Sequence, residues 1–294
     1  MALPFSLPPP RGFDCQPIWL GNGFQLGNSR VGVLEYSANV SGWSDDLTAL
    51  HEDSAGAAHP IDVASRRDAI RQLRKHITAA DPIILEVGCS SGYMIGALRL
   101  AFPHGLLIGA DVVKEPLYRL AAAMPTVPLL RFDLNECPLP DASIDAVVML
   151  NVLEHIADDG LALKQVRRIL KPSGMLVLEV PAGPSLYDAY DTALRHFRRY
   201  DMKALSRKLV DTGFDIVRRS HLGFFVYPLF ALIKRRNRHR APGTDLKGLV
   251  ARQASRTASS PMIALAFAAE MAVGSWLNFP IGIRCLLTCR SAVV

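Results

Sequence analysis

Short apolar runs alternate with helix-like segments between Asp81 and Val180. The runs are apolar almost throughout, as in strands buried on both faces of a sheet, whereas the segments between them repeat apolar residues every three or four positions. The expected strands are Ile83–Val87, Leu106–Ala110, Val127–Phe132, Ile144–Leu150 and Met175–Val180. The expected helices are Met94–Ala101, Glu115–Ala123 and Leu161–Leu170. This alternation predicts βαβ units and a parallel sheet.

Further elements are expected on both sides of this region. Before it, apolar residues mark one face of a helix from Val63 to about Ile77, and Asp62 is placed to cap its first turn. The elements expected after it are a helix near Met202–Thr212 and strands near Phe214–Arg218 and Ile283–Cys289. Gly174 and Gly213 follow helix-like segments, so both are expected to stop a helix.

Two segments do not share the alternating pattern. Residues 1–60 are rich in Pro, Gly, Ser and Asn, which predicts an irregular arm with one or two short elements. Trp19, Tyr36 and Trp43 indicate that this arm packs on the main domain. The predicted organisation is an arm at 1–60, an α/β core at 61–222, a hydrophobic and basic helical insertion at 223–282, and a last core strand at 283–294.

The most informative stretch joins the first expected strand to the next helix. From Glu86 to Gly92 it reads Glu-Val-Gly-Cys-Ser-Ser-Gly, an acid at the strand end followed by a turn with two glycines. Glycines let a ligand approach the backbone, and the following helix N-terminus offers unpaired N–H groups and the positive end of a dipole. This indicates a nucleotide-like ligand, although the spacing is not the Gly-x-Gly-x-x-Gly of dinucleotide binders.

Three more polar residues lie where expected strands end. Asp111 follows the second strand about 20 residues past the loop, where a carboxylate accepts hydrogen bonds from ribose hydroxyls. Asp133 follows the third strand, where it is placed to accept a hydrogen bond from an exocyclic amine, and Asn151 follows the fourth. Open α/β sheets bind ligands at this edge, so the three are expected at one site. Taken singly, each acid is equally well explained as a helix cap.

In this order the motifs resemble those of the class I S-adenosylmethionine-dependent methyltransferases, especially members that act on small molecules, lipids or glycans. The stretches that carry the resemblance are residues 86–92, Ala-Asp at 110–111, Phe-Asp-Leu at 132–134, Asn-Val-Leu-Glu-His-Ile at 151–156 and Leu-Lys-Pro-Ser-Gly at 170–174. The resemblance covers about residues 81–222. It implies an α/β Rossmann-like fold with a seven-stranded, mostly parallel sheet, helices on both faces, and Ile283–Cys289 as an antiparallel last strand beside the sixth.

The resemblance also implies contacts with S-adenosylmethionine, which would leave as S-adenosylhomocysteine. The expected cofactor contacts are Glu86, Gly88, Cys89, Ser90, Gly92, Asp111, Val112, Asp133, Leu134 and Asn151. The loop residues would surround the methionine part, Asp111 would hold the ribose, and Asp133 would meet the adenine edge. Asn151 would lie near the transferred methyl. Ser90 departs from the family, whose middle loop residue is glycine.

Methyl transfer from a sulfonium requires alignment and exclusion of water, and it needs a base only when the nucleophile arrives protonated. His155 and His196 are the candidate bases, because each follows a strand on the substrate side of the sheet. For His155, a packing or capping role is an equally good interpretation.

The segment from Asp188 to Tyr200 is similar to the His-x-Arg-Arg-Tyr segment of methyltransferases associated with glycan assembly. The expected substrate contacts are Tyr93, Tyr190, Arg198, Arg199 and Tyr200. The two arginines are expected to grip a phosphate or carboxylate, the alternative being a solvated helix face.

The insertion contains two apolar stretches. Leu222–Ile233 is shorter than the about 20 residues that a membrane span needs. Met262–Phe279 contains Glu270, and a carboxylate is costly at bilayer depth. Helices that cover the sheet edge are therefore expected, or a surface for membrane or a lipid tail. The five positive charges of Lys234–Arg240 fit either an anionic lipid surface or a solvated loop.

Composition and charge exclude few classes of protein function. Half of the 294 residues are hydrophobic and a fifth are charged, which predicts a sizeable core. The net charge of +6 is compatible with acidic small molecules, anionic membranes or nucleic acid, but aromatics are not interleaved with the basic run as single-strand binders require. The five cysteines form no Cys-x-x-Cys pair, so no metal site is predicted, and reduced thiols in a cytosolic protein are expected. The proline-broken start is not expected to act as a signal peptide.

The predicted function is S-adenosylmethionine-dependent methyl transfer to a small-molecule, glycan-linked or lipid-like acceptor, with transfer to oxygen favoured. Peripheral membrane contact is considered for residues 222–240 and 262–279, and nucleic acid is not expected as a partner. Two alternatives stay open. A non-catalytic cofactor-binding subunit would retain the same motifs, whereas the glycine spacing and the extra acids argue against an NAD-dependent oxidoreductase.

Overall fold

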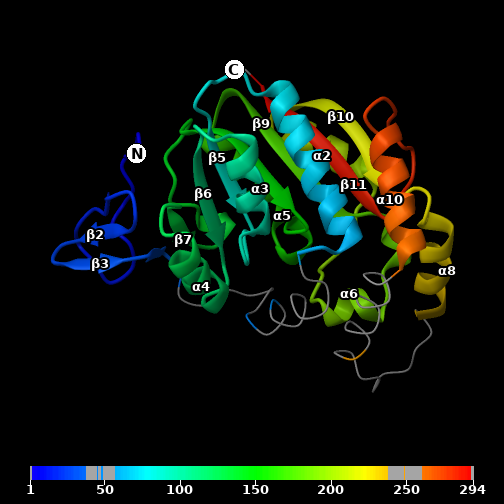
Figure 1. Cartoon of the computed structure of the whole chain (residues 1–294), viewed down its shortest axis with the longest axis horizontal. Helices are drawn as coiled ribbons and strands as arrows, with labels where there is room; N and C mark the ends of the chain where they lie inside the picture. The colour runs from blue at the N-terminus through cyan, green and yellow to red at the C-terminus, as the bar shows by residue number, and fades with distance from the viewer. Residues whose placement is uncertain are drawn as a thin grey trace.

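The computed structural model describes residues 2–37, 45, 48, 57–237, 248 and 260–292 of the chain. Its main sheet consists of β4 (Val33–Glu35), β5 (Ile83–Val87), β6 (Leu106–Asp111), β7 (Leu129–Arg131), β8 (Ile144–Leu150), β9 (Leu170–Pro181), β10 (Phe214–Leu222) and β11 (Arg284–Ser291). Their order across the sheet is β10, β11, β9, β8, β5, β6, β7 and β4 (Figure 1). This order confirms the predicted α/β Rossmann-like fold.

The last strand inserts where the resemblance implied. β11 lies between β9 and β10 and pairs with both in antiparallel register, whereas the pairings from β4 to β9 are parallel. The described sheet has one strand more than the expected seven, because Val33 and Leu34 of the N-terminal arm are buried and β4 pairs with β7. The arm thereby completes one edge of the core.

Helices pack on both faces of this sheet (Figure 1). They include α2 (Pro60–His76), α3 (Tyr93–Ala101), α4 (Glu115–Ala123), α5 (Asp159–Ile169) and α7 (Met202–Asp211). Alternate residues of β5 face opposite layers: Ile83 and Leu85 join the cluster that contains α5 and α7, whereas Ile84 joins the cluster that contains α2, α3 and α4. Burial on both faces explains why the runs are apolar throughout.

Two expected helix boundaries were wrong. Helix α2 begins at Pro60 after the N-cap residue His59, because proline suits the first turn. Asp62 lies inside that turn and pairs with Arg284 instead of capping the helix. Helix α5 ends at Ile169, and Gly174 lies within β9, so it does not stop the helix.

The arm contains more regular structure than expected. Its residues form a small antiparallel sheet of β1 (Ile18–Trp19), β2 (Phe24–Leu26) and β3 (Ser29–Val31), which projects to one side in Figure 1. Trp19 and Phe24 contact each other with ring centroids 4.7 Å apart, and both belong to the main core cluster. The hydroxyl of Tyr36 donates to the Pro8 carbonyl. The third expected anchor, Trp43, lies outside the described residues.

The insertion forms α8 (Tyr227–Asn237) and α10 (Pro261–Val273), which stand beyond the β10 edge in Figure 1. Phe267 of α10 packs with Ile61 and Ala64 of α2. Within the described ranges, none of the helices combines the length and the apolar character that crossing a bilayer requires. One helix of the insertion therefore packs against the core through a small apolar cluster.

The structure explains why the second apolar stretch contains a carboxylate, Glu270. It is buried, and it accepts a hydrogen bond of 2.6 Å from the Gly223 N–H at the end of β10. Burial raises its pKa, while hydrogen bonds from the backbone N–H groups of Gly223, Phe225 and Phe224 lower it. This carboxylate therefore joins α10 to the chain that leaves the sheet.

Replacing Glu270 by leucine should lower the free energy of unfolding by about 2–3 kcal/mol, because buried N–H groups lose their acceptor. Chemical denaturation of the variant measures this loss. The matched control is Met262→Ala on the exposed side of the same helix, for which a change below about 0.5 kcal/mol is expected. Equal stability of the Glu270 variant and the native chain would contradict the assigned role.

Candidate functional site

A cavity of about 440 Å³ lies at the carboxyl ends of the parallel strands. Strands β5 to β9 each contribute a residue at or just beyond their last position: Val87, Asp111, Phe132, Leu150 and Pro181. The opposite wall comes from the start of α2, from α6 (Ala189–Ala193) and from α8. The volume and position are those of a small-molecule site in an open α/β sheet.

The loop after β5 has a backbone that only small residues can follow. Gly88 has φ +81°, and a Cβ there would lie 2.4 Å from Cγ2 of Val152. Gly92 has φ +79° and would meet Leu120 at the same distance. Ser90, which replaces the family's middle glycine, also adopts a positive φ of 43°. The loop therefore keeps its left-handed turn despite the serine.

Asp111 ties this loop to the end of β6. Its Oδ2 accepts the Ser90 N–H at 2.7 Å, and its Oδ1 accepts the Val112 N–H at 2.7 Å and the Val113 N–H at 3.3 Å. Burial raises its pKa, and these backbone donors oppose the rise. The carboxylate is thus held in one orientation at the cavity wall, where the sequence placed it.

Glu86 offers a buried oxygen for a ligand. Its Oε2 has no hydrogen-bond partner among the described residues. Burial and the neighbouring charge of Asp111 raise the pKa of Glu86 well above its usual value, while Arg66 opposes the rise. A ligand ammonium would supply the missing donor, as would the amino-acid part of S-adenosylmethionine. The residues present therefore fit that cofactor.

Asp133 and Asn151 complete the set of strand-end polar groups. Oδ1 of Asp133 accepts a hydrogen bond from the Asn135 N–H at 2.9 Å and thereby caps the short helix η1 (Leu134–Glu136). Asp133 therefore has the capping role that was the alternative to a ligand contact. The residue nevertheless lines the cavity together with Leu134. The amide of Asn151 donates to Glu179 Oε1 at 2.7 Å. Both residues therefore reach the cavity from fixed positions.

Most of the predicted contacts line the cavity. Those that do are Glu86, Gly88, Cys89, Ser90, Asp111, Val112, Asp133, Leu134, Asn151, Tyr93, Tyr190, Arg199, His155 and His196. Gly92, Arg198 and Tyr200 are not part of its wall. Arg198 pairs with Asp159 at 2.9 Å, and the Tyr200 hydroxyl donates to the same carboxylate at 3.0 Å. Asp159 thus draws both side chains away from the site.

Arg199 reaches the cavity but is engaged elsewhere. Its guanidinium pairs with Asp191 at 2.9 Å and donates to the Ala182 carbonyl at 2.8 Å. It also lies over the ring of Phe230, with 5.5 Å from Cζ to the centroid. These contacts make Arg199 a residue that joins α6, β9 and α8, and not the expected grip on a substrate anion.

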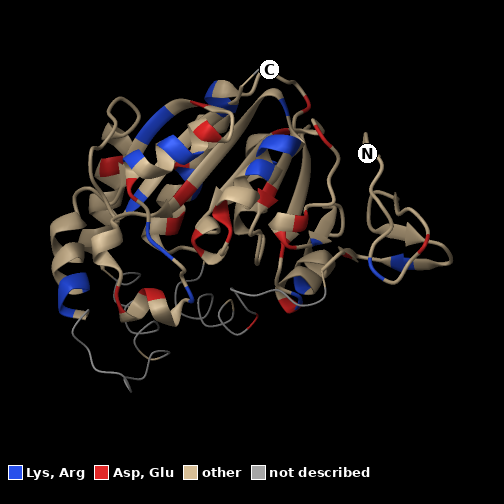
Figure 2. Ribbon diagram, turned by 180° about the vertical axis from the view of Figure 1, so that it is seen from behind, with Lys and Arg blue, Asp and Glu red and all other residues tan. Residues whose placement is uncertain are grey.

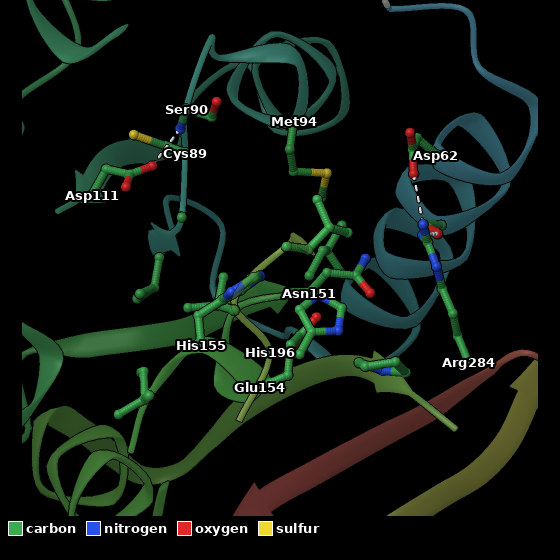
Figure 3. A pocket seen from close by; sticks show the side chains of 18 of the residues that line it. Asp62, Cys89, Ser90, Met94, Asp111, Asn151, Glu154, His155, His196 and Arg284 are labelled. Atoms are coloured by element: carbon green, nitrogen blue, oxygen red, sulfur yellow. Dashed lines mark hydrogen bonds and ion pairs between the residues drawn. The ribbon is translucent and has the colours of Figure 1, made fainter. Parts of the chain in front are cut away.

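The two candidate histidines lie together. The rings of His155 and His196 have centroids 4.7 Å apart and meet edge to face. Nδ1 of His196 lies 2.9 Å from Asp191 Oδ1. Burial lowers the pKa of His196, and Asp191 opposes this, so the neutral ring is favoured near pH 7. Figure 3 shows both rings beside Asn151, across the cavity from Ser90 and Asp111.

A second buried cation, Lys234, was not predicted from the sequence. Within the basic run this side chain is 1% exposed, and its Nζ binds Asp188 at 2.7 Å and Asp191 at 2.8 Å. The interpretation of the whole run as a solvated loop or lipid-binding patch was therefore wrong for this residue. Arg235 and Arg236 are exposed, whereas Arg238, His239 and Arg240 lie outside the described residues.

Arg284 is the other cavity residue that sequence reasoning missed. Its Nη1 lies 2.6 Å from Glu179 Oε1, and its Nη2 lies 3.0 Å from Asp62 Oδ1 (Figure 3). Ser65 donates to the same Glu179 oxygen. Arg284 opens the last strand, far in sequence from its partners, so local patterns carry no signal for this network.

The chain shares a domain with known methyltransferases. Residues 85–178 match the family model described as a methyltransferase domain. A probable S-adenosylmethionine-dependent methyltransferase of Mycobacterium tuberculosis is 32% identical over 146 residues, which are 49% of this chain and 52% of that protein. A demethylmenaquinone methyltransferase of Staphylococcus aureus is 33% identical over 106 residues, which are 35% of this chain and 44% of that protein.

Solved structures share the fold at lower identity. The 4+2 cyclase SpnF aligns over 78% of this chain and 81% of its own, with a TM-score of 0.52 and 18% identity. This likeness shows the fold alone, and its name shows that the fold is not restricted to methyl transfer. The chain spans about half the length of the curated methyltransferase of M. tuberculosis that it matches.

The strand order, the glycine loop and the strand-end acids define a Rossmann-like methyltransferase domain. Residues 85–178 are thus a methyltransferase domain, similar to that of probable S-adenosylmethionine-dependent methyltransferases, and S-adenosylmethionine is the cofactor that these relatives imply.

Replacing Asp111 by alanine should weaken binding of S-adenosylhomocysteine by about 10- to 100-fold, because a charged acceptor is lost and the loop is released. Isothermal titration calorimetry measures the change. Asp141→Ala serves as the control, since that carboxylate is exposed and pairs only with Arg168 at the far end of β8. Unchanged affinity of the Asp111 variant would rule out its role as a cofactor ligand.

Proposed function

We propose that the protein transfers the methyl group of S-adenosylmethionine to an oxygen atom of a small amphipathic acceptor. One observation carries this proposal: a single cavity joins the cofactor-type groups, such as Glu86 and Asp111, to the pair His155 and His196. The groups that suit the cofactor and the groups that suit an acceptor therefore line one cavity. Alignment and exclusion of water are the main demands of the reaction.

The cofactor end consists of groups that are already fixed by the fold. Glu86 would hold the ammonium, Asp111 the ribose, and Asp133 with Leu134 the adenine edge. When bound, the cofactor supplies a methyl group activated by its sulfonium. Asn151 separates this end from the histidines, and its amide is anchored on Glu179.

The acceptor end favours oxygen as the nucleophile. A hydroxyl arrives protonated and must lose its proton as it attacks. His155 and His196 meet that demand with ring nitrogens beside the cavity. Asp191 fixes the Nδ1 side of the His196 ring, so Nε2 is the nitrogen left for the reaction. The pairing of His196 with Asp191 supports a role in the chemistry over simple packing.

Incubation with S-adenosylmethionine carrying a deuterated methyl group should label one acceptor in an extract of the source cells. Aqueous and lipid fractions are analysed by mass spectrometry, and fragment ions of the product locate the label on oxygen, nitrogen or carbon. The Asp111→Ala variant, which is expected to bind cofactor weakly, provides the matched blank.

Label on nitrogen or carbon would overturn the oxygen assignment while leaving the transfer itself intact. Cofactor binding with no labelled product in either fraction would count against a transferase and would favour a non-catalytic cofactor-binding subunit. Formation of S-adenosylhomocysteine, measured in the same samples, gives an independent count of turnovers.

The amphipathic character of the acceptor follows from α8. One side of this helix lines the cavity through Phe230 and Lys234, whereas Leu229 and Leu232 on its other side are exposed. We call the exposed apolar side chains of this region the apolar face: Leu229, Leu232, Ile233, Met262, Leu265, Trp276 and Leu277. An acceptor with an apolar tail would find this surface next to the cavity.

A lipid surface suits the apolar face. Trp276 is 88% exposed, which is unusual for a tryptophan without a partner surface. Arg235 and Arg236 are exposed at the end of α8, and Figure 2 shows this basic end beside mostly uncharged turns of α8 and α10. Apolar side chains beside cations are the combination that anionic membranes bind.

Vesicles of phosphatidylcholine and phosphatidylglycerol should co-sediment with the protein, and a Leu265→Ser, Trp276→Ser double variant should bind them at least about tenfold more weakly. Leu100→Ser on α3 is the control, because it removes an equally exposed leucine from another part of the surface. Equal vesicle binding by the double variant and the native chain would exclude the apolar face as the contact.

A further inference from the structure

We propose that Glu154, His155 and His196 together bind a divalent transition-metal ion at the acceptor end of the cavity. Each of the three offers one ligand atom, and these atoms all lie within 4.8 Å of one another. Figure 3 shows the three side chains gathered on the same side of the cavity. Two imidazoles and one carboxylate are a donor set that Zn²⁺, Fe²⁺, Mn²⁺ and Co²⁺ accept.

The backbone places the three residues side by side. Glu154 and His155 lie in η2 (Leu153–His155), directly after β8. The Phe197 N–H donates to the Glu154 carbonyl at 2.8 Å, which holds the His196 segment against this turn. Metal bonds of about 2.0–2.2 Å bring ligand atoms to about 3–3.5 Å from one another, so small side-chain rotations close the set.

Glu154 supplies the independent reason to expect a cation. It is 1% exposed, and neither Oε1 nor Oε2 has a hydrogen-bond partner among the described residues. Burial of a carboxyl group without hydrogen-bond partners is costly. A metal ion would satisfy these oxygen atoms.

The nearby side-chain cations do not meet this need, because other carboxylates hold them. Lys234 binds Asp188 and Asp191, Arg199 binds Asp191, and Arg284 binds Glu179 and Asp62. Glu154 takes part in none of these pairs. These three cations are thus paired with other carboxylates, although the charges of Arg284 and Arg199 still act on Glu154 through space.

The support around His196 is typical of a metal ligand. Asp191 is fully buried and forms ion pairs with Arg199 and Lys234. An ionised carboxylate at 2.9 Å accepts a hydrogen bond, so His196 carries its proton on Nδ1 and has a lone pair on Nε2. Carboxylate–histidine pairs of this kind orient metal ligands and raise their basicity.

The role of the ion in catalysis rests on the proposed methyl transfer. Three protein ligands leave positions for an acceptor oxygen, and both histidines line the cavity. With an ion bound, the two histidines would serve as its ligands and not as bases. The ion would lower the pKa of the acceptor hydroxyl, whose proton would be released to solvent as the acceptor binds. The oxygen then forms a bond to the methyl carbon while the carbon–sulfur bond breaks, and its electron pair stays on sulfur as the neutral thioether.

The test of binding uses Co²⁺ and Zn²⁺ and needs neither cofactor nor acceptor. The full chain is stripped with EDTA and titrated with each ion in a calorimeter, and Co²⁺ binding is followed by visible absorption. One ion per chain is expected, with the absorption bands of nitrogen and oxygen ligation.

Glu154→Gln and His196→Gln keep side-chain size and should each weaken metal binding by at least about 100-fold, which is more than the loss of a residue that only orients a ligand costs. His104→Ala removes an exposed histidine elsewhere and should bind as the native chain does.

Stoichiometric binding that both glutamine variants lose supports the site, provided that circular dichroism shows them folded. If one of the two variants fails to fold, the metal affinity of the other variant tests the site. Metal binding that is absent, or equally strong in a folded variant and the native chain, overturns the proposal.

In the labelled-methyl assay, metal-stripped protein should transfer the methyl group at least about tenfold more slowly, and added Co²⁺ should restore the rate. Undiminished transfer without metal refutes the catalytic role, whereas stoichiometric metal binding without any transfer leaves the site standing and counts against the proposed function alone.

Discussion

The buried pair of Arg284 and Glu179 holds the cavity and the last strand in one arrangement. Arg284 opens β11, and Glu179 lies on β9, the strand beside it. Loss of either partner would leave a charge in a low-dielectric interior, which costs far more than an exposed pair gains. Glu179 also accepts hydrogen bonds from Ser65 of α2 and from Asn151 just beyond β8, and Arg284 also donates to Asp62 of α2. One set of charges therefore fixes the floor of the cavity from four parts of the chain.

Because of this network, the polar groups around the cavity bind one another before a ligand arrives. Asp111 holds the glycine loop, and Asp191 holds His196. A ligand meets groups whose positions are already determined, so little ordering is needed when it binds. Two carboxyl groups that have unpartnered buried oxygens, Glu86 and Glu154, line the same cavity. They mark the positions at which positive charge from outside the chain is expected.

Elements and site residues were predicted correctly from the sequence where a local pattern of residues determines them. The strands Ile83–Val87 and Ile144–Leu150 were predicted with their observed bounds, because burial on both faces requires a largely apolar run. The strand-end acids and the glycine loop were predicted from their spacing. Lys234 was not predicted, since its burial depends on two aspartates that fold onto it from another helix. Arg284 and strand β4 were missed for the same reason: their partners are distant in sequence.

The antiparallel pairing of β10 with β11 has a consequence for how such an enzyme changes its substrate. Residues 223–283 are topologically only the connection of a hairpin, so evolution can lengthen, shorten or replace them without disturbing the strand order. The strand-end groups of the cavity belong to the sheet, whereas Phe230, Lys234 and Ile283 of this connection line another part of it. Exchange of the connection between homologues would therefore alter acceptor choice independently of cofactor use. A transplanted segment would need a residue to replace Lys234. Without it, the buried Asp188 would lose its cation, and Asp191 would keep only Arg199 and His196.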